Sequence, residues 1–394
     1  MKLALFTIIA TLFLVNAVLA VDSSLEASTH DLTLVVGSHA QVELVARNYT
    51  RDNATLTLSQ TDRALIPHYL TLVNGSATVN VTALKPTSKL LVEVQNCTEN
   101  ESNCTIDLSE AFFRLTIVKS NFINVLVEIV GWGYFFAWSI SFYPQILLNI
   151  QRKSVIGLNF DFLLLNIIGF GAYSIYNLLM YFDPYVISLY HLNNPRTPQP
   201  VLANDVVFAV HAFFASLFTA FQCLIYEREN QKISNKCYGL TSLLVTFGVG
   251  SALTAAVGWI SVLELVKCLS YIKMAVTMSK YFPQAFFNYQ RKSTVGWSIG
   301  NVLLDFTGGS LDILQMVLQA VNVDDWGAFS QNPVKFGLGL VSIIFDVIFI
   351  FQHYVLYRNP AGQDEYSGIE NPEAQQENVS SPDYGSQARL EEDN

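Results

Sequence analysis

The feature that most constrains the fold of this chain is a series of apolar stretches, each long enough to cross the hydrocarbon core of a bilayer. Of the 394 residues, 51% are hydrophobic and only 14% are charged, which is too apolar for an ordinary soluble protein. The sequence therefore predicts an α-helical polytopic membrane protein with seven transmembrane helices. The expected spans are about 122–147, 160–182, 204–226, 237–259, 262–285, 299–320 and 335–356.

Loop charges predict how these spans are oriented. Lys and Arg follow the first, third and fifth spans, at Gln151–Lys153, at Glu227–Lys236 and at Gln290–Lys292, whereas the intervening loops hold few. Because cytosolic loops are enriched in Lys and Arg, the N-terminus is expected in the lumen and the C-terminus in the cytosol. A seven-helix receptor would share this orientation.

The N-terminal region has the patterns of a secreted domain. Residues 1–20 resemble a signal peptide, and residues 21–120 alternate apolar and polar residues between turn residues, which predicts a small luminal, antiparallel β-sandwich. A disulfide between Cys97 and Cys104 fits an oxidising lumen, and a metal pair there would lack a nearby His. A luminal domain would also be glycosylated, and the region holds seven N-glycosylation sequons, at Asn48, Asn53, Asn74, Asn80, Asn96, Asn100 and Asn103.

The membrane region, residues 121–357, contains an internal repeat. SFYPQILLNIQRKS begins at Ser141, and KYFPQAFFNYQRKS begins 139 residues later at Lys280. Further on, FQCLIY from Phe221 is similar to FQHYVLY from Phe351. Two copies of three helices in the same orientation need one helix between them, so the sequence predicts a 3+1+3 parallel repeat, with substrate bound near the membrane midplane between two three-helix bundles.

The repeated Pro-Gln pairs are interpreted as hinges. Proline removes a backbone donor and kinks its helix, which frees a carbonyl one turn earlier. A single Pro in a membrane helix needs no functional explanation, but Pro144 with Gln145 and Pro283 with Gln284 occupy equivalent places in an aligned repeat. We therefore expect paired hinges in the first and fifth spans.

Ionisable residues inside the spans indicate a transport pathway, because they are costly in lipid. Asp305 corresponds to Asn166 in the other repeat, an arrangement that suits the ammonium and carboxylate groups of an amino-acid-like substrate. Burial favours the neutral form of a carboxyl group, so Asp305 is a candidate for proton coupling. The alternative is a structural ion pair, for example between Asp305 and Lys273.

Other residues in the spans have competing interpretations. Asp205 is equally suited to capping the third span or to relaying protons, and Asp346 lies in the middle of the seventh span, where a cap cannot explain it. Lys280 is expected to extend to the cytosol, and His211 and His353 are expected to make packing contacts. The aromatic residues that flank the kinks are candidates for lining a substrate site: Trp138, Phe142 and Tyr281.

The tail, residues 358–394, holds two basic and nine acidic residues and is expected to be disordered. Tyr366-Ser-Gly-Ile369 fits the Tyr-x-x-apolar pattern that clathrin-adaptor proteins read in extended cytosolic peptides. The tail therefore carries a candidate sorting signal, with Tyr366 and Ile369 as its contacts.

The two Pro-Gln motifs, NVLLDFTGGSLDILQM, KFGLGLVSIIFDV and the sequon-rich N-terminal region together closely resemble the cystinosin family, PQ-loop exporters of cystine from lysosomes. The resemblance implies proton coupling through Asp305 and Asp205, lysosomal membrane residence and contact with a nutrient-sensing complex. It assigns substrate contact to Asn166, Lys273, Asn301, Lys335 and the aromatics by the kinks. The family's tail ends in Gly-Tyr-x-x-Leu, whereas the motif here is internal.

Several classes of function are disfavoured. The acidic balance, a net charge of −10, gives no reason to expect nucleic acid as a partner, and the sequence holds no nucleophile–base pair or phosphate-binding loop that would indicate an enzyme. No cofactor is expected beyond the proton as coupling ion. The remaining alternatives are a PQ-loop transporter of a cationic amino acid and a non-transporting sorting receptor.

Overall fold

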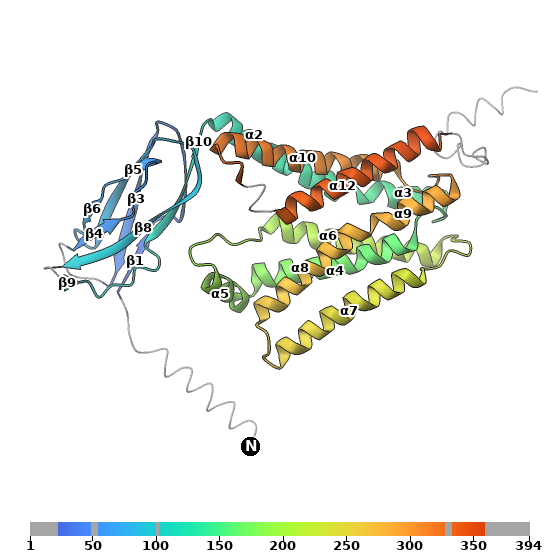
Figure 1. Cartoon of the computed structure of the whole chain (residues 1–394), viewed down its shortest axis with the longest axis horizontal. Helices are drawn as coiled ribbons and strands as arrows, with labels where there is room; N and C mark the ends of the chain where they lie inside the picture. The colour runs from blue at the N-terminus through green and yellow to red at the C-terminus, as the bar shows by residue number, and fades with distance from the viewer. Residues whose placement is uncertain (1–22, 49–53, 100–101, 328–332, 359–394) are drawn as a thin grey trace, which may run out of the picture. The chain divides into compact units, whose positions relative to one another are not determined.

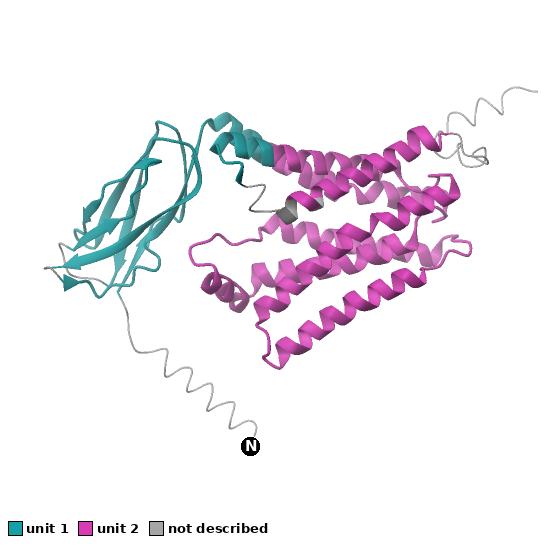
Figure 2. Ribbon diagram, in the orientation of Figure 1, with its two compact units in different colours: residues 1–128, 316–331 teal, residues 129–315, 332–394 magenta. Residues whose placement is uncertain are grey.

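The computed structural model describes residues 23–48, 54–99, 102–327 and 333–358. The expected signal peptide and the tail with Tyr366 and Ile369 lie outside the described residues. Contacts within the chain define two compact units (Figure 2). One comprises residues 1–128 with 316–331, and the other comprises residues 129–315 with 332–394.

The first unit contains two β-sheets. One has the strand order β1-β3-β7-β5, and the other has the order β2-β10-β8-β4-β6, with β9 paired to β8. The strands are β1 (Ser24–Ala27), β2 (Asp31–Val35), β3 (His39–Arg47), β4 (Thr55–Leu58), β5 (Ala64–Leu65), β6 (Tyr69–Thr71), β7 (Ser76–Ala83), β8 (Thr87–Glu99), β9 (Ser102–Asn103) and β10 (Phe112–Val118).

The predicted alternation places one face of each sheet in a shared core. Val79 and Val81 of β7 and Leu115 of β10 have no exposed surface, whereas Asn80 between the two valines is exposed. One detail of the prediction is wrong, because β2 and β10 pair in parallel. These strands are far apart in sequence, so no hairpin imposes an antiparallel direction on them.

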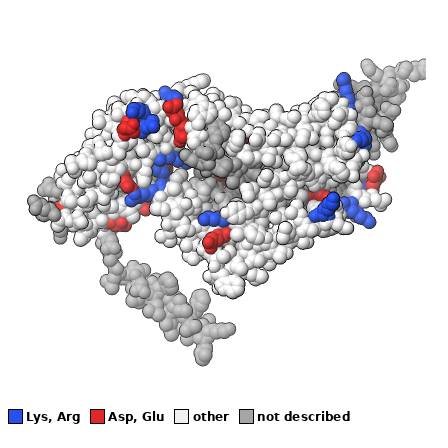
Figure 3. Space-filling model, viewed as in Figure 1, with Lys and Arg blue, Asp and Glu red and all other residues white. Residues whose placement is uncertain are grey.

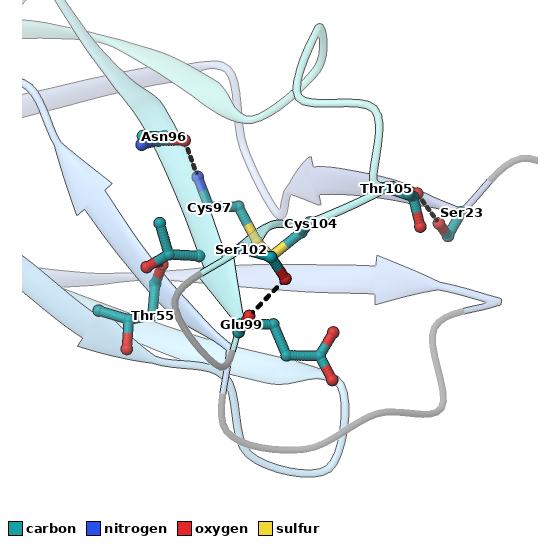
Figure 4. Close-up of a disulfide and its surroundings, with 9 residues drawn as sticks. Ser23, Thr55, Asn96, Cys97, Glu99, Ser102, Cys104 and Thr105 are labelled. Carbon is teal, nitrogen blue, oxygen red and sulfur yellow. Dashed lines mark hydrogen bonds between the residues drawn. A yellow bond between two sulfur atoms is a disulfide. The ribbon is translucent and has the colours of Figure 1, made fainter.

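Cys97 of β8 and Cys104 form a disulfide with a Cα–Cα distance of 5.3 Å (Figure 4). The Cys104 N–H also donates to the Cys97 carbonyl at 3.0 Å. Five of the seven sequon asparagines are described, and each of them is exposed: Asn48, Asn74, Asn80, Asn96 and Asn103. The other two, Asn53 and Asn100, lie outside the described residues.

The rest of the described chain is helical. The helices are α2 (Asn121–Ile140), α3 (Phe142–Arg152), α4 (Phe160–Phe182), α5 (Pro184–Asn193), α6 (Ala203–Ile225), α7 (Asn235–Ala256), α8 (Val262–Ser279), α9 (Tyr281–Arg291), α10 (Ile299–Val323) and α12 (Pro333–Phe351), followed by the π-helix η1 (Gln352–Leu356). The short α5 was not expected, although Asp183 caps it and Pro184 starts it.

Five helical segments among the described residues are long and apolar enough to cross a membrane: Asn121–Arg152, Phe160–Phe182, Ala203–Ile225, Asn235–Ala256 and Gly339–Leu356. The expected fifth and sixth spans, α8 with α9 and α10, are not among them. These helices carry the intramembrane Lys273, Asp305 and Asp312, which lower their hydropathy. On the face drawn in Figure 3, charged side chains gather near helix ends, and the long sides of the helices are largely uncharged.

The two Pro-Gln motifs interrupt their helices in the same way. α2 gives way to α3 at Ser141, and α8 gives way to α9 at Lys280, in each case three residues before the proline. Since proline clashes with the preceding turn and supplies no N–H, the break falls where the continuous ladder fails. Both helices are therefore interrupted one turn before Pro144 and Pro283, and the role of these positions as kinks and hinges stays a prediction.

Glycines allow helices of different repeats to approach closely. α4 packs against both α6 and α8 (Figure 1). A Cβ placed on Gly169 of α4 would lie 2.6 Å from the Val276 side chain of α8, and one on Gly308 of α10 would lie 2.5 Å from Trp138 of α2. Gly169 and Gly308 are 139 residues apart, so the internal repeat extends to this packing as well.

Candidate functional site

Each Pro-Gln glutamine binds the backbone of the other repeat. The Gln145 side-chain amide donates to the Gly296 carbonyl at 3.0 Å, and its oxygen accepts from the Ser298 N–H at 2.8 Å. Gln284 binds the Gly157 carbonyl and the Asn159 N–H at 3.0 and 2.8 Å. The two glutamines are almost fully buried, so these four bonds join the repeats in a symmetrical exchange.

An amide chain holds each glutamine in place. Gln145 donates to Asn149 at 2.9 Å, and Asn149 donates to Gln222 of α6 at 2.8 Å. The other repeat has the same chain, in which Gln284 donates to Asn288 and Asn288 to Gln352 of η1. Buried amides that satisfy one another fix a single geometry.

The exchanged bonds bring two loops into direct contact. Gly157 and Gly296 have positive φ angles of 110° and 90°, and a Cβ on Gly157 would lie 2.7 Å from the Cα of Gly296. Arg152 and Arg291 brace the loops by donating to the Ile156 and Val295 carbonyls at 2.9 and 3.0 Å. Both loops follow a Gln-Arg-Lys segment, so the contact lies at the end of the helices that the positive-inside pattern assigns to the cytosol.

A second polar cluster surrounds Asp305 and lies between helices, apart from the two loops. The Tyr281 hydroxyl donates to Asp305 Oδ2 at 3.0 Å, and the Ser342 hydroxyl donates to the same oxygen at 3.2 Å. Tyr281 and Ser342 are also 2.9 Å apart through their hydroxyl oxygens. Three helices, α9, α10 and α12, therefore meet at one carboxylate.

Lys280 and Asp346 extend this cluster. Lys280 Nζ donates to Asn166 Oδ1 of α4 at 3.1 Å, and it interacts electrostatically with Asp305 and Asp346. The expectation that Lys280 extends to the cytosol is wrong, since only 8% of it is exposed. The side chain of Lys280 therefore lies across the gap to α4 and stays within the helical unit. Asp346 is 1% exposed, and its Oδ2 has no hydrogen-bond partner within the described part of the chain.

The ammonium group of Lys273 is surrounded by aromatic side chains. Its Nζ lies 3.8 Å from the ring centroid of Phe170 and 5.5 Å from that of Tyr173. The alternative of an ion pair between Lys273 and Asp305 is not what the structure shows, because among the described residues no carboxylate lies within ion-pair distance of Lys273. The two groups interact only at longer range.

Trp138 and Phe142 pack beside this region. Phe142 contacts Phe170 edge to face at 5.5 Å, and Trp138 lies against Gly308. His211 makes the expected packing contact, with Nε2 2.8 Å from the Tyr143 hydroxyl, and His353 makes another, with Nδ1 2.8 Å from Thr294 Oγ1.

Three candidates remain: Asp205, Asn301 and Lys335. Asp205 Oδ2 accepts from the Leu202 N–H at 2.9 Å, which is the capping interaction that was one of its two interpretations; the proton relay stays a prediction. Asn301 lies one turn before Asp305 on α10, with its own N–H donating to Ser298. The side chain of Lys335 lies outside the described residues, so its substrate contact stays a prediction.

Sequence reasoning missed Phe170 and Ser342. The repeat did contain a signal for the exchanged glutamines, because Asn149, Gly157 and Gln222 all recur in the second copy. It contained none for Phe170, whose position in the second repeat holds Gly309.

Comparison with known proteins agrees with this geometry. A family model described as PQ loop repeat matches residues 126–186 and 265–325, which include both Pro-Gln motifs. The fold and the duplicated motif thus define a PQ-loop membrane protein.

Full-length similarity is more specific. The chain is 54% identical over 366 residues to "Cystinosin homolog" of Caenorhabditis elegans, covering 92% of this chain and 90% of that protein. It is 42% identical to "Cystinosin" of Drosophila melanogaster, covering 90% and 89%. A "Cystine transporter" of Saccharomyces cerevisiae is 30% identical over 59% of this chain and 95% of its own length. The chain belongs to the cystinosin family.

Proposed function

We propose that this chain exports L-cystine from the lysosomal lumen to the cytosol, coupled to protons, by alternating access. The observation that carries the proposal is the polar cluster between the two repeats. Acidic, basic, amide and aromatic groups from α4, α8, α9, α10 and α12 converge there, within a unit of membrane-capable helices.

Cystine suits the chemistry of this cluster. It has two ammonium and two carboxylate groups and therefore needs acceptors and donors at both ends. Asp305 and Asn166 supply acceptors, and Lys273, Lys280 and Tyr281 supply donors, with Asn301 and Lys335 proposed as further contacts. The printed name of the yeast relative, a cystine transporter, supports this substrate.

Proton coupling is proposed for the acids in the cluster. Asp305 and Asp346 interact electrostatically with each other and with Lys280, so protonation of one acid changes the energy of the other. Two carboxylates that share one ammonium titrate as a coupled set, so this set is the proposed place where a proton binds and leaves during transport. Asp205, which caps α6, is proposed as a third coupling residue on the resemblance alone.

Alternating access is supported by the repeat. Seven spans in a 3+1+3 arrangement would place α2 to α6 in one bundle and α8 to η1 in the other, with α7 between them. The exchanged glutamines close the two bundles against each other at the Gly157–Gly296 contact. For the substrate site to open on the side of this contact, these four hydrogen bonds must be lost. The helix interruptions at Ser141 and Lys280 act as hinges for that movement.

The cellular setting is proposed from the same evidence. The N-terminal β-sandwich would lie in the lumen with its exposed sequons glycosylated, and the C-terminal tail would lie in the cytosol. Tyr366 and Ile369 would bind clathrin-adaptor proteins, and the cytosolic face would contact the lysosomal nutrient-sensing complex, its proton pump and its GTPase scaffold.

Uptake of labelled cystine tests the proposal. Full-length protein reconstituted in vesicles should accumulate cystine when the side corresponding to the lumen is acidic. Unlabelled cystine should compete, and lysine and arginine should not. Accumulation of a cationic amino acid instead would identify a different PQ-loop substrate, and no substrate movement would favour a sorting receptor.

A further inference from the structure

Phe170 of α4 lies close to both lysines of the candidate site, with 5% of its surface exposed. Lys273 Nζ is 3.8 Å from its ring centroid, and Lys280 Nζ is 5.5 Å from it. Phe142 and Phe208 contact the ring edge to face, at 5.5 Å and 71° and at 6.2 Å and 80°. These neighbours fix the orientation of the ring, so its negative face is held toward the ammonium groups.

The two lysines use this ring differently. Lys280 also has a hydrogen bond to Asn166. For Lys273, no hydrogen bond from Nζ occurs within the described ranges, and its nearest described partners are the rings of Phe170 and Tyr173. A poorly solvated ammonium without an acceptor is costly, and the nearby Lys280 adds repulsion; the aromatic face next to Nζ and the carboxylate of Asp305 at longer range both oppose this cost.

An ion pair would have been the simpler way to hold Lys273. A bond to Asp305 would occupy the carboxylate that is proposed to carry the proton, and it would have to break before a substrate carboxylate could bind Lys273. The aromatic ring stabilises the cation but leaves its N–H donors available. The ring thereby separates the anion-binding group from the proton-binding group.

We propose that Phe170 is a positioning residue for substrate binding, whose ring holds the charged Lys273 ammonium ready for a carboxylate of the substrate. The inference rests on the proposed function, since it assigns Lys273 to one end of cystine. Its consequence is that the electron density of one ring sets the affinity for substrates that bear a carboxylate at this end.

Fluorination of the ring tests this without changing its shape appreciably. Phe170 is replaced by mono-, di- and trifluorophenylalanine in the full-length protein, and cystine uptake is measured in vesicles. Each fluorine weakens the attraction of the ring for a cation, so KM should rise stepwise, by about 5- to 30-fold at the trifluoro stage, with the maximal rate within about twofold of the unmodified protein. The same series at Phe208 is the matched control, and its KM should stay constant.

A second measurement needs no substrate and separates this inference from the proposed function. The rate at which an amine-reactive ester labels Lys273 in purified protein is followed by mass spectrometry. Labelling should accelerate along the Phe170 series, because a less stabilised ammonium yields more of the reactive amine. Constant labelling, or a KM that is flat or changes equally at Phe208, would show that Phe170 only packs. Graded labelling in a protein that moves no cystine would support the role of Phe170 and refute the proposed substrate.

Discussion

The Gln145 side chain donates to the Gly296 carbonyl, and Gln284 donates to the Gly157 carbonyl in return, both at 3.0 Å. Each glutamine thus closes the loop of the repeat to which it does not belong. The Pro-Gln pair therefore has two parts with separate tasks: proline breaks the helix, and glutamine fastens that helix to the opposite repeat.

The glycines beneath these bonds leave no room for a side chain. Gly157→Ala or Gly296→Ala should abolish transport or reduce it by at least about tenfold, because the new Cβ would clash with the Val295 or Ile156 carbonyl and both positions have positive φ. Gly239→Ala on α7 is the control, since open space surrounds that position. Cystine uptake at equal expression measures the effect, and full activity of both loop variants would refute the tight contact.

Replacing a glutamine should weaken the closed contact. Gln145→Leu removes a donor and an acceptor, which leaves the Gly296 carbonyl and the Ser298 N–H unpaired at a cost of about 1–3 kcal/mol each if they stay buried. We expect slower transport and faster labelling of a cysteine placed at Ser298 by a cytosolic reagent. Gln151→Leu, at an exposed position of the same helix, should behave like the parent. Equal labelling of the two variants would argue against an exchanged bond.

Lys280 is expected to be indispensable, contrary to an interpretation in which it reaches the cytosol. Lys280→Met leaves Asp305 and Asp346 without their nearby cation and Asn166 without its donor, and loss of a buried charge partner typically costs about 3–5 kcal/mol. The variant should have a lower Tm and little uptake. Lys267→Met, at an exposed position of α8, the helix that ends just before Lys280, should resemble the parent. A fully active Lys280→Met protein would contradict the cluster.

The N-terminal β-sandwich, which we propose to be luminal, should tolerate an acidic compartment. Arg114 donates to both carboxylate oxygens of Asp31 at 2.7 and 2.6 Å, and this hydrogen bonding lowers the pKa of Asp31 from 3.8. The resulting stability is present above pH 3.8 and is lost as the pH falls through the lower folded-state pKa.

Asp31→Asn should therefore lower domain stability at pH 5 and pH 7 by about 0.5–1 kcal/mol, since the carboxylate is largely exposed. The difference from the parent should shrink as the pH falls below 3.8 and vanish once Asp31 is protonated in the folded protein as well. Limited proteolysis of the full-length protein at each pH reports how readily the domain unfolds and so measures the stability difference between Asp31→Asn and the parent. A difference that grows toward low pH would contradict the assignment.

Much of the fold followed from local sequence patterns. Periodicity predicted the strands and helices, and Pro144 and Pro283 predicted the two breaks, because proline acts on its own helix. The parallel pairing of β2 with β10 did not follow, since it depends on contacts between distant segments. The disulfide of Cys97 with Cys104 joins near neighbours in sequence and was accordingly foreseeable.

The site was less predictable for the same reason. Asp305 was found because charge in an apolar helix is conspicuous, whereas Phe170 is one of 27 phenylalanines and gains its role only through Lys273. The position of Lys280 near a helix end predicts an extended side chain that reaches the cytosol, whereas the structure shows it bound to Asn166 of α4, a residue 114 positions away that the local pattern cannot reveal.

The most direct test of proton-coupled export measures proton and cystine fluxes together in vesicles that hold either the parent protein or Asp305→Asn. We predict that a pH gradient, acidic on the side that corresponds to the lumen and neutral on the other side, drives cystine and protons through the parent protein in a fixed ratio. Asp305→Asn should lose gradient-driven accumulation while retaining some exchange of cystine for cystine. Accumulation of cystine by Asp305→Asn to the same level, with the same proton ratio, would contradict the account.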